Sequence, residues 1–546
     1  VDSLQKVEYS EDFKKWLELS EEEKANTLMP RMFNISYTNP ISKNPLNVAR
    51  LLKSTANPKY SLRDIISENL AIRNQQDTNL CWAFATLSSL ETNLALYNYN
   101  RGINTDKIYD FSERHMEYAT SKTFANDVKN PLGYNKEVGS GGSYQIAQSY
   151  LTNGSGAVLE SDMPFENNEN IIDISQIQNK NISSQVYDTI SFPDYQTATG
   201  EEKTNIMNQI KEHIQNYGGV QGSLHGNSSN VSSFSCYNNS TGAKYCNNTD
   251  LHPIDHAISI IGWDDNYSVD NFTESNKPSS NGAWIARNSW GDKIEYSVLE
   301  VKQAIFNAYK NQEIGKDWNS AEDVPDNLVE SNGYTIDGDI AYIPYGDNGF
   351  IYVSYEDVNI SKNMFGIVKA SDTVDYDNIY QYDYYFPGMQ LNAPTQNILL
   401  GNIFNKESVG TEYLTQISLY APETYTCKVY VNPNGTSFSK DDLKQVSLKT
   451  GETETFSTGY HTLEFAKPIE INSNSFSVVV EIQSNNQNSV KVSLETKIPG
   501  LNTWDSVTTE KGKCFYSFGN NLDSAEWVDI GTLHDMNSSF SNGDST

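Results

Sequence analysis

Apolar residues recur at helical spacing just after Cys81, in the stretch NQQDTNLCWAFATLSSLETNLALY. Phe84, Leu87, Leu90 and Leu94 follow one another at intervals of three, three and four residues, which predicts a long helix with a buried face. A loop precedes this helix and delivers the cysteine to its first turn. Unpaired backbone N–H groups and the positive end of the helix dipole favour the nucleophilic thiolate there. The alternative is a buried structural cysteine.

Two later apolar runs predict buried strands with polar residues at their ends. His256 precedes the run 257–262, and Asn288 follows the short run 283–286. An imidazole that projects from a strand end is suited to act as a base. An asparagine amide that accepts from one imidazole N–H would fix the tautomer and the direction of the ring.

Two further side chains suit the same chemistry. Gln75 lies six residues before Cys81, and its uncharged amide would donate to the oxyanion that forms when a thiolate attacks a carbonyl. Trp290, two residues after Asn288, would shield the bond between that amide and the imidazole of His256. Together these residues predict a cysteine nucleophile with its base, its orienting amide and its oxyanion donor.

The motifs around these residues resemble the papain family of cysteine proteases. NQ-x5-CWAFA, DHA-x4-GW, NSWG and NGFIYVSY stand in the order of that family. The resemblance implies an α+β, two-lobed fold over residues 60–370, with a helical left lobe and a β-barrel right lobe. It also implies that Gln75 is the oxyanion-hole residue, Cys81 the nucleophile, His256 the general base and acid, and Asn288 the residue that orients the imidazole.

The same resemblance implies a set of substrate-binding residues. Gly141 and Gly142, in GSGGSYQ, would offer their backbone to an extended substrate, although two glycines before a helix also suit a plain turn. Val220 and Ala257 would form the wall of the hydrophobic substrate pocket. Trp290 is also expected to be a substrate-binding residue.

Residues 1–59 are predicted to be a removable propeptide. The stretch EDFKKWLELSEEEKANTL places Phe13, Trp16 and Leu17 on one helical face, with an acidic face opposite. A connector rich in Pro, Asn and Ser follows this helix. The alternative is an ordinary N-terminal helix with a linker.

An insertion at about 292–345 separates NSWG from NGFIYVSY. Val298, Val301, Ile305 and Ala308 repeat at helical spacing, and the acidic stretch DWNSAEDVPDNLVE after them is expected to form a loop. Such an insertion would either gate the cleft or decorate the lobe.

Residues 371–546 predict a C-terminal antiparallel β-sandwich, because short β-branched and aromatic runs alternate with turn signals. The resemblance, which is closest to the clostridial cell-wall and surface-layer-processing proteases, implies a lectin-like domain here. Exposed tyrosines would stack on cell-wall glycan, and Asp372, Asp375 and Asp377 would offer ligands to a structural calcium ion. A packed tyrosine edge and a solvated acidic loop are the alternatives.

The amino-acid composition of the chain argues against several classes of binding partner. The chain has 39 Lys and Arg against 70 Asp and Glu, a net charge of −31, which argues against nucleic acid and anionic membranes as partners. No run of eighteen apolar residues predicts a membrane span. The first residues lack the pattern of a signal peptide, so any such segment is expected to have been removed already.

Five cysteines suit an exported protein that does not rely on disulfides, although Cys236 and Cys246 would close a short loop.

The charge, the motifs and the likeness to the papain family predict a secreted or cell-wall-associated cysteine endopeptidase, and the resemblance to the clostridial branch implies a Gram-positive, clostridial source. It would be a monomer, made as a zymogen, that cleaves proteins or peptides through a thioester and needs no cofactor for catalysis. His252 and His256 lie four residues apart, but the sequence offers no third ligand for a catalytic metal. A glycan-binding adhesin with a papain-like scaffold and a transpeptidase that uses the same thioester remain as alternatives.

Overall fold

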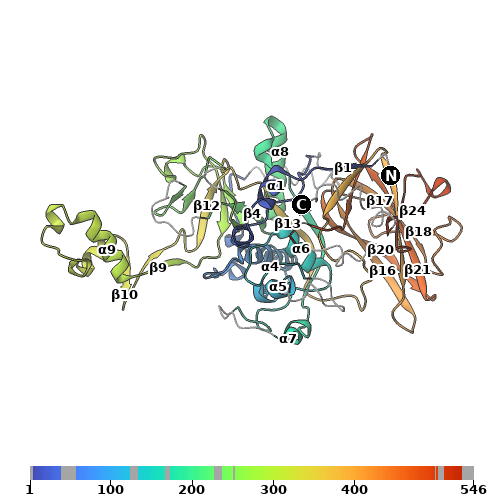
Figure 1. Ribbon diagram of the computed structural model, residues 1–546, viewed down its shortest axis with the longest axis horizontal. Coiled ribbons are helices and arrows are strands. Elements are labelled where there is room, and N and C mark those ends of the chain that lie inside the picture. The colour runs from blue at the N-terminus through green and yellow to red at the C-terminus, as the bar shows by residue number, and fades with distance from the viewer. Residues whose placement is uncertain are drawn as a thin grey trace.

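The computed structural model of the chain describes residues 4–37, 57–122, 133–165, 173–226, 236–249, 253–498, 500–501 and 510–531. Figure 1 shows a small arm on the left, a mixed body of helices and strands in the centre, and a β-rich part on the right. The body and the β-rich part each have a large hydrophobic core, and the arm has a small one.

Helix α4 (Cys81–Arg101) runs through the centre of the body and begins at the predicted cysteine. Its apolar face is buried as predicted, and the side that carries Ser88, Glu91 and Asn93 is buried as well. Glu91 on that side has no exposed surface, because its carboxylate accepts from the Arg73 guanidinium at 2.9 Å and from the backbone N–H of Phe111 at 2.9 Å. The helix is therefore packed on all sides from Cys81 to Leu96, and its last turn is largely exposed.

Three shorter helices pack against α4. They are α5 (Glu113–Ala119), α6 (Tyr144–Thr152) and α8 (Gly200–Tyr217), whereas α7 (Ile174–Gln178) packs against α5. Serine residues start α5 and α6 by accepting from the backbone N–H three residues later. None of the described helices is long and apolar enough to cross a membrane.

The body sheet brings the ends of two predicted strands together. Its strand order is β3-β13-β4-β7-β8-β12-β6-β5, with β2 also paired to β7, and its ladders are antiparallel except for that between β12 and β6. The strands are β2 (Lys59–Ser61), β3 (Gln185–Ser191), β4 (Val220–Leu224), β5 (Tyr237–Asn238), β6 (Ala243–Lys244), β7 (His256–Asp264), β8 (Ala283–Arg287), β12 (Phe350–Ser354) and β13 (Phe365–Ser371). Because Ser259 of β7 pairs with Arg287 of β8, the start of β7 lies beside the end of β8.

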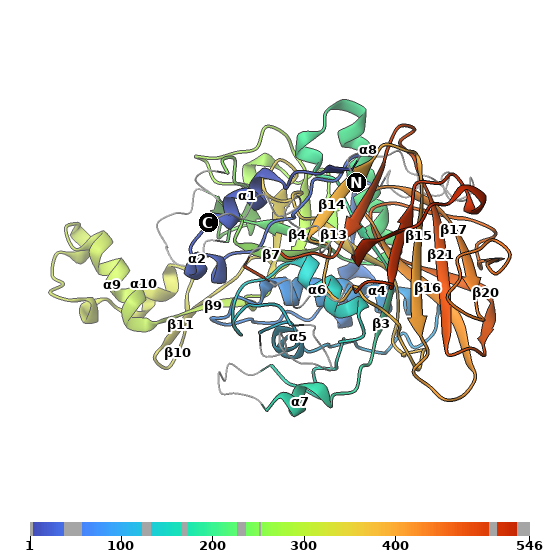
Figure 2. The ribbon, with the colours of Figure 1, turned by 45° about the vertical axis from the view of Figure 1, so that its right-hand side comes forward.

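The predicted insertion forms the arm. It contains β9 (Lys293–Ser297), α9 (Val298–Tyr309), α10 (Asp326–Ser331), β10 (Thr335–Asp337) and β11 (Ile340–Pro344). In Figures 1 and 2 the arm stands away from the body, and β9 and β11 connect the two. The acidic stretch expected to be a loop contains α10, which starts after Pro325. The arm core consists of Val301, Ile305, Val324, Val329 and Ala341.

The β-rich part consists of antiparallel strands, as the alternating sequence predicts. The strands are β14 (Met389–Ala393), β15 (Asn397–Asn405), β16 (Glu412–Ala421), β17 (Tyr425–Asn432), β18 (Lys444–Val446), β19 (Glu454–Phe456), β20 (Gly459–Ile471), β21 (Ser475–Ser484), β22 (Val490–Leu494), β23 (Cys514–Ser517) and β24 (Val528–Asp529). The largest sheet of the β-rich part has the strand order β18-β17-β21-β15-β23-β24, and β19 also pairs with β17. Strands β16 and β20 form a separate pair. Their facing apolar side chains form the second core.

The β-rich part packs closely against the body. The Ser191 backbone N–H donates to the Thr458 carbonyl at 3.0 Å, across the two parts. Tyr385 and Phe386, which follow the expected boundary at residue 371, belong to the hydrophobic core of the body. The contact between the two parts is therefore a packed interface.

The N-terminal segment (residues 4–37) is built into both parts. Strand β1 (Gln5–Lys6) pairs with β14, and the single expected helix is divided into α1 (Glu11–Leu17) and α2 (Glu21–Ala25). The division occurs because Ser20 and Glu23 form a reciprocal capping box that starts a second helix. Phe13 of α1 is fully buried in the body core.

Candidate active site

Five of the residues predicted from sequence line one open cleft of the body. They are Gln75, Cys81, His256, Asn288 and Trp290, and the cleft has a volume of about 1240 Å³. Cys81 comes from the first turn of α4, His256 from the start of β7, and Asn288 from the residue after β8. The fold thus brings together side chains that are far apart in the sequence.

His256 and Asn288 form the hydrogen bond that the sequence predicts. The distance from His256 Nε2 to Asn288 Oδ1 is 2.8 Å. The backbone N–H of Ser289 also donates to Oδ1, so this atom is the acceptor and His256 Nε2 must carry the proton. In the neutral ring, Nδ1 is then the nitrogen able to accept a proton. Trp290 stacks on the imidazole with 4.3 Å between ring centroids.

Burial keeps the thiol and the imidazole neutral. The loss of water around the sulfur raises the pKa of the Cys81 thiol to about 12. Hydrogen bonds from the backbone of Ala257, Trp82 and Cys81 itself act in the opposite direction and lower this pKa. Loss of water likewise lowers the pKa of His256 to about 4, although its bond to Asn288 acts in the other direction. Burial therefore acts against the expected bias toward thiolate while the N-terminal segment is in place, whereas the backbone N–H groups at the helix start act in its favour.

Gln75 is held in place by Ser289, the residue that follows Asn288. Its Oε1 accepts from the Ser289 hydroxyl at 2.6 Å, and its backbone N–H donates to the Ser289 carbonyl at 2.7 Å. Its Nε2 donates to the carbonyl of Thr78 at 2.7 Å. An amide nitrogen has two hydrogens, so one remains for another acceptor in the cleft.

Gly141 and Gly142 bind the N-terminal segment in this structure. The N–H of Gly141 donates to the carbonyl of Ala25 at 2.6 Å, and the N–H of Met29 donates to the carbonyl of Gly142 at 2.9 Å. A Cβ on Gly141 would lie 2.1 Å from the carbonyl oxygen of Thr27, so only glycine permits this approach. Thr27 itself lines the cleft. The backbone positions predicted for substrate are occupied by the chain's own N-terminal segment.

The structure corrects the predicted pocket wall. Val220 has no exposed surface and pairs with Ile260 in the interior of the sheet, whereas Leu224, at the other end of β4, pairs with His256 and lines the cleft. Both residues lie on the same face of β4, and only the register with β7 decides which one reaches the cleft. Ala257 is buried, and its backbone forms a hydrogen bond with the Cys81 thiol.

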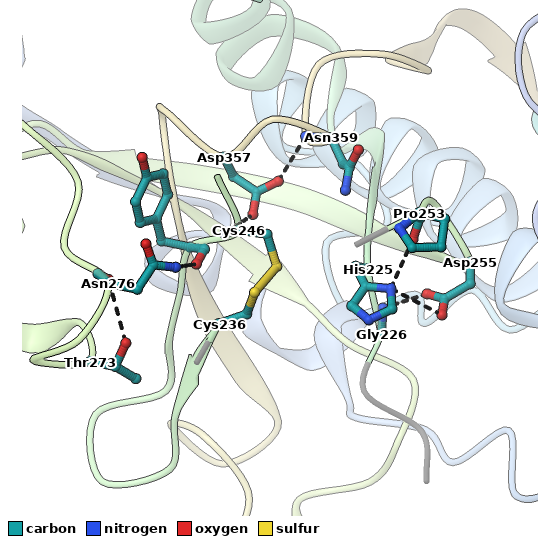
Figure 3. Close-up of a disulfide and its surroundings, with 11 residues drawn as sticks. His225, Gly226, Cys236, Cys246, Pro253, Asp255, Thr273, Asn276, Asp357 and Asn359 are labelled. Atoms are coloured by element: carbon teal, nitrogen blue, oxygen red, sulfur yellow. Dashed lines mark hydrogen bonds and ion pairs between the residues drawn. A yellow bond between two sulfur atoms is a disulfide. The ribbon is translucent and has the colours of Figure 1, made fainter. Parts of the chain in front are cut away.

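Tyr345 is a site residue that the sequence did not reveal. Its hydroxyl accepts from Asn288 Nδ2 at 2.8 Å, and its ring stacks on Tyr237 with centroids 5.6 Å apart. Tyr345 lies at the end of the insertion, where no motif marks it. Tyr237 follows Cys236, which forms a disulfide with Cys246 (Figure 3). The disulfide loop and the base of the arm therefore both support the orienting amide.

The end of the disulfide loop is fixed to the body. Figure 3 shows that the Asp357 carboxylate accepts from the backbone N–H of Cys246 at 2.9 Å and from that of Asn359 at 3.0 Å. On the other side of the view, Asp255 lies 3.3 Å from His225 Nδ1. Asp255 immediately precedes His256, so this contact helps to fix the start of β7.

The comparisons with known proteins agree with this geometry. Residues 59–299 match the family model of the papain family cysteine proteases, and residues 379–540 match that of the lectin-like domain. This chain carries a papain-family cysteine protease domain. A lectin-like domain follows the protease domain, as expected. No curated protein matches the chain.

Two solved structures share the fold. One contains the cysteine protease and lectin-like domains of Cwp84, a surface-layer-associated protein of Clostridium difficile. It is 21% identical, with a TM-score of 0.67, and the match covers 98% of this chain and 96% of that one. The other is the clostridial cysteine protease Cwp84 after propeptide cleavage, which is 22% identical with a TM-score of 0.61 over 87% of this chain and 96% of that one.

No metal site is evident in the described part of the protease and lectin-like domains. Within it, no group of three or more His, Cys, Asp or Glu side chains could hold a metal ion, and His252 lies outside the described residues. Asp372 accepts from Lys107 and Tyr109, and Asp375 accepts from Tyr187. A structural calcium ion therefore stays a prediction that rests on resemblance.

The Tyr345 hydroxyl is expected to position Asn288. Tyr345→Phe removes the acceptor of Asn288 Nδ2 and should lower kcat/KM for peptide hydrolysis by about three- to tenfold, the effect of one hydrogen bond. Tyr352→Phe is the matched control, because the Tyr352 hydroxyl donates to Asp347 instead. Equal activity of Tyr345→Phe and the unsubstituted enzyme would show that Asn288 does not need this contact.

The neutral thiol predicts a pH-dependent reaction with iodoacetamide. In the unprocessed chain, the alkylation rate of Cys81 should rise about tenfold per pH unit from pH 7 to 9, because only the thiolate reacts and its pKa lies far above this range. The chain should carry Cys427→Ser and Cys514→Ser, which remove the two other free cysteines. A rate that is fast and constant over this range would instead indicate a preformed thiolate–imidazolium pair.

Proposed function

We propose that this protein is a cysteine endopeptidase made as a zymogen and that Cys81, His256, Asn288 and Gln75 carry its chemistry. The observation that supports this proposal most strongly is the shared cleft, in which Cys81 lies at a helix start and His256 is oriented by Asn288. The papain-family match of the same region supports the same reaction class.

The reaction begins when the N-terminal segment leaves and a peptide takes its place. His256 Nδ1 removes the proton from the Cys81 thiol, and Sγ attacks the carbonyl carbon of the scissile bond. The negative charge on the carbonyl oxygen is stabilised by the remaining N–H of Gln75 Nε2. The imidazolium then donates its proton to the leaving amine, so that a thioester to Cys81 remains.

Water completes the cycle. His256 Nδ1 removes a proton from a water molecule, which attacks the thioester carbonyl, and the proton passes to Sγ as the acid product leaves. Asn288 holds the ring by its bond to Nε2 throughout, and Trp290 covers this bond from one side. Removal of the N-terminal segment also admits water to the cleft, which reduces the energetic cost of a charged thiolate.

The zymogen proposal rests on how firmly the N-terminal segment is held. Arg31 is buried, and its guanidinium donates to the carbonyls of Phe192 at 2.6 Å and Met364 at 2.7 Å and to the Tyr144 hydroxyl at 2.8 Å. With Gly141 and Gly142, these contacts hold residues 25–31 across the cleft. The structure of Cwp84 after propeptide cleavage, which covers less of this chain than the other Cwp84 structure, suits a removable segment.

We further propose that the lectin-like domain places the enzyme at a glycan-bearing bacterial cell surface. Its family match supports a binding role, and Cwp84, which shares the fold, is a surface-layer-associated protein. A pure adhesin is less well supported, because a scaffold would not need the His256–Asn288 bond or the stacked Trp290. A transpeptidase would use the same thioester, and added amines would then appear in its products.

Substitutions in the cleft should separate the nucleophile from the orienting residue. Cys81→Ala should abolish peptide hydrolysis, whereas Cys427→Ala, which changes a buried cysteine of the lectin-like domain, should preserve it. Asn288→Ala leaves the His256 N–H unpaired and should lower kcat/KM by roughly five- to 150-fold, the equivalent of about 1–3 kcal/mol. Full hydrolysis by Cys81→Ala would refute the assignment of the nucleophile.

The N-terminal segment should be removed by the enzyme itself. Incubation of the unsubstituted chain should produce a cut near residues 50 to 62, identified by N-terminal sequencing, and Cys81→Ala should stay full length. Arg31→Ala should speed this conversion, because the segment loses three hydrogen bonds, whereas Arg101→Ala at the exposed end of α4 should not. A fully active chain that still carries residues 1–37 would show that the segment does not inhibit.

A further inference from the structure

The arm presents an unpaired strand edge at the cleft. In the described structure the arm sheet has the order β10-β11-β9, so β9 pairs on one side only. Residues 293–296 of β9 line the same cleft as Cys81 and His256. Figures 1 and 2 show β9 running from the body into the arm, so this edge continues outward from the site.

The ladder between β9 and β11 shows which backbone groups are unpaired. Tyr345 N–H donates to the Asp292 carbonyl, and Val298 N–H donates to the Asp339 carbonyl, at the two ends of the ladder. Since hydrogen-bonded pairs alternate in an antiparallel ladder, the even-numbered residues of β9 face β11. Pro344, which has no N–H, lies opposite Lys293 and agrees with this alternation.

The odd-numbered residues of β9 consequently direct their backbone groups away from β11. Ser297 N–H is already used, because it donates to the Glu300 carboxylate at 2.8 Å. Lys293 and Glu295 remain, each with an N–H and a carbonyl on the open edge. Their side chains form an ion pair at 2.8 Å, so the edge itself carries little net charge.

We propose that this edge binds an extended segment of the polypeptide substrate as an additional antiparallel or parallel strand. The proposal rests on the protease function proposed above and extends its substrate site into the arm. Four backbone groups of Lys293 and Glu295 would pair with alternate residues of the substrate. A strand of five residues spans roughly 17 Å, which corresponds to about five substrate residues.

The chemistry of the edge favours a peptide over other ligands. Unpaired N–H and carbonyl groups that alternate along a strand match the backbone of an extended chain, whatever its side chains. Charged side chains on an exposed edge oppose pairing between copies of the protein, and Lys293 and Glu295 are both exposed. Substrates would therefore be selected for an extended, accessible segment next to the scissile bond.

Proline at position 295 tests this strand addition. Glu295→Pro removes one N–H on the open edge and leaves the β9–β11 hydrogen bonds in place, because Glu295 and Tyr342 form a non-hydrogen-bonded pair. For a twelve-residue peptide, kcat/KM of the processed enzyme should fall by about three- to tenfold. Glu295→Ala removes the same carboxylate but keeps the N–H, so its kcat/KM for this peptide should clearly exceed that of Glu295→Pro. A dipeptidyl coumarin amide, too short to reach β9, should be hydrolysed equally by all three enzymes.

Substrates with single N-methyl groups provide a second test that needs no substitution in the enzyme. Along the part of the twelve-residue peptide that reaches β9, N-methylation of every second amide should slow cleavage, and this alternation should weaken in Glu295→Pro. An equal rate for Glu295→Pro and the unsubstituted enzyme on the long peptide, or the lack of any two-residue alternation, would overturn the proposal. Failure of the unsubstituted enzyme to cleave the coumarin amide would instead contradict the protease function.

Discussion

The hydrogen bond between His256 and Asn288 depends on the register of two neighbouring strands. A bulge between Ile260 and Gly262 shifts the pairing of β7 with β8, and this shift sets which residues meet at the ends of the two strands. The end of β8 is in turn fixed to α4, because the Arg287 guanidinium donates to the Ser88 hydroxyl at 3.0 Å. The helix that carries the thiol and the strands that carry the imidazole and the amide thus form one rigid unit.

In the proposed zymogen, the N-terminal segment would control access to the cleft that contains Cys81. Three kinds of contact hold the N-terminal segment. Its strand β1 pairs with β14 of the lectin-like domain, its Phe13 is buried in the protease core, and its Arg31 donates to two backbone carbonyls of the body. One cut after this segment would leave these non-covalent contacts in place, so release requires them to break as well. The same burial raises the pKa of the Cys81 thiol and lowers that of the His256 imidazole, so in the proposed zymogen the bound segment would oppose the reaction through both geometry and charge.

Local sequence signals predicted the central elements well, whereas contacts between distant segments were missed. The spacing of Phe84 to Leu94 predicted α4, and the apolar runs after His256 and before Asn288 predicted β7 and β8. The sequence contains the Ser20–Glu23 capping box that starts α2, but its apolar spacing predicts one helix through this point. The sequence predicts Val220 at the pocket wall, where the structure places Leu224, and no motif marks Tyr345. Strand register and the return of the arm to the body are set by tertiary packing, which local sequence signals do not contain.

The most direct test of this account is the reaction of Cys81 with an epoxysuccinyl inhibitor before and after removal of residues 1–59, followed by peptide mapping. The account predicts slow labelling of the full-length chain, fast labelling of the processed chain, and modification at Cys81 alone. Equal rates for the two forms, or a modification on another residue, would contradict it.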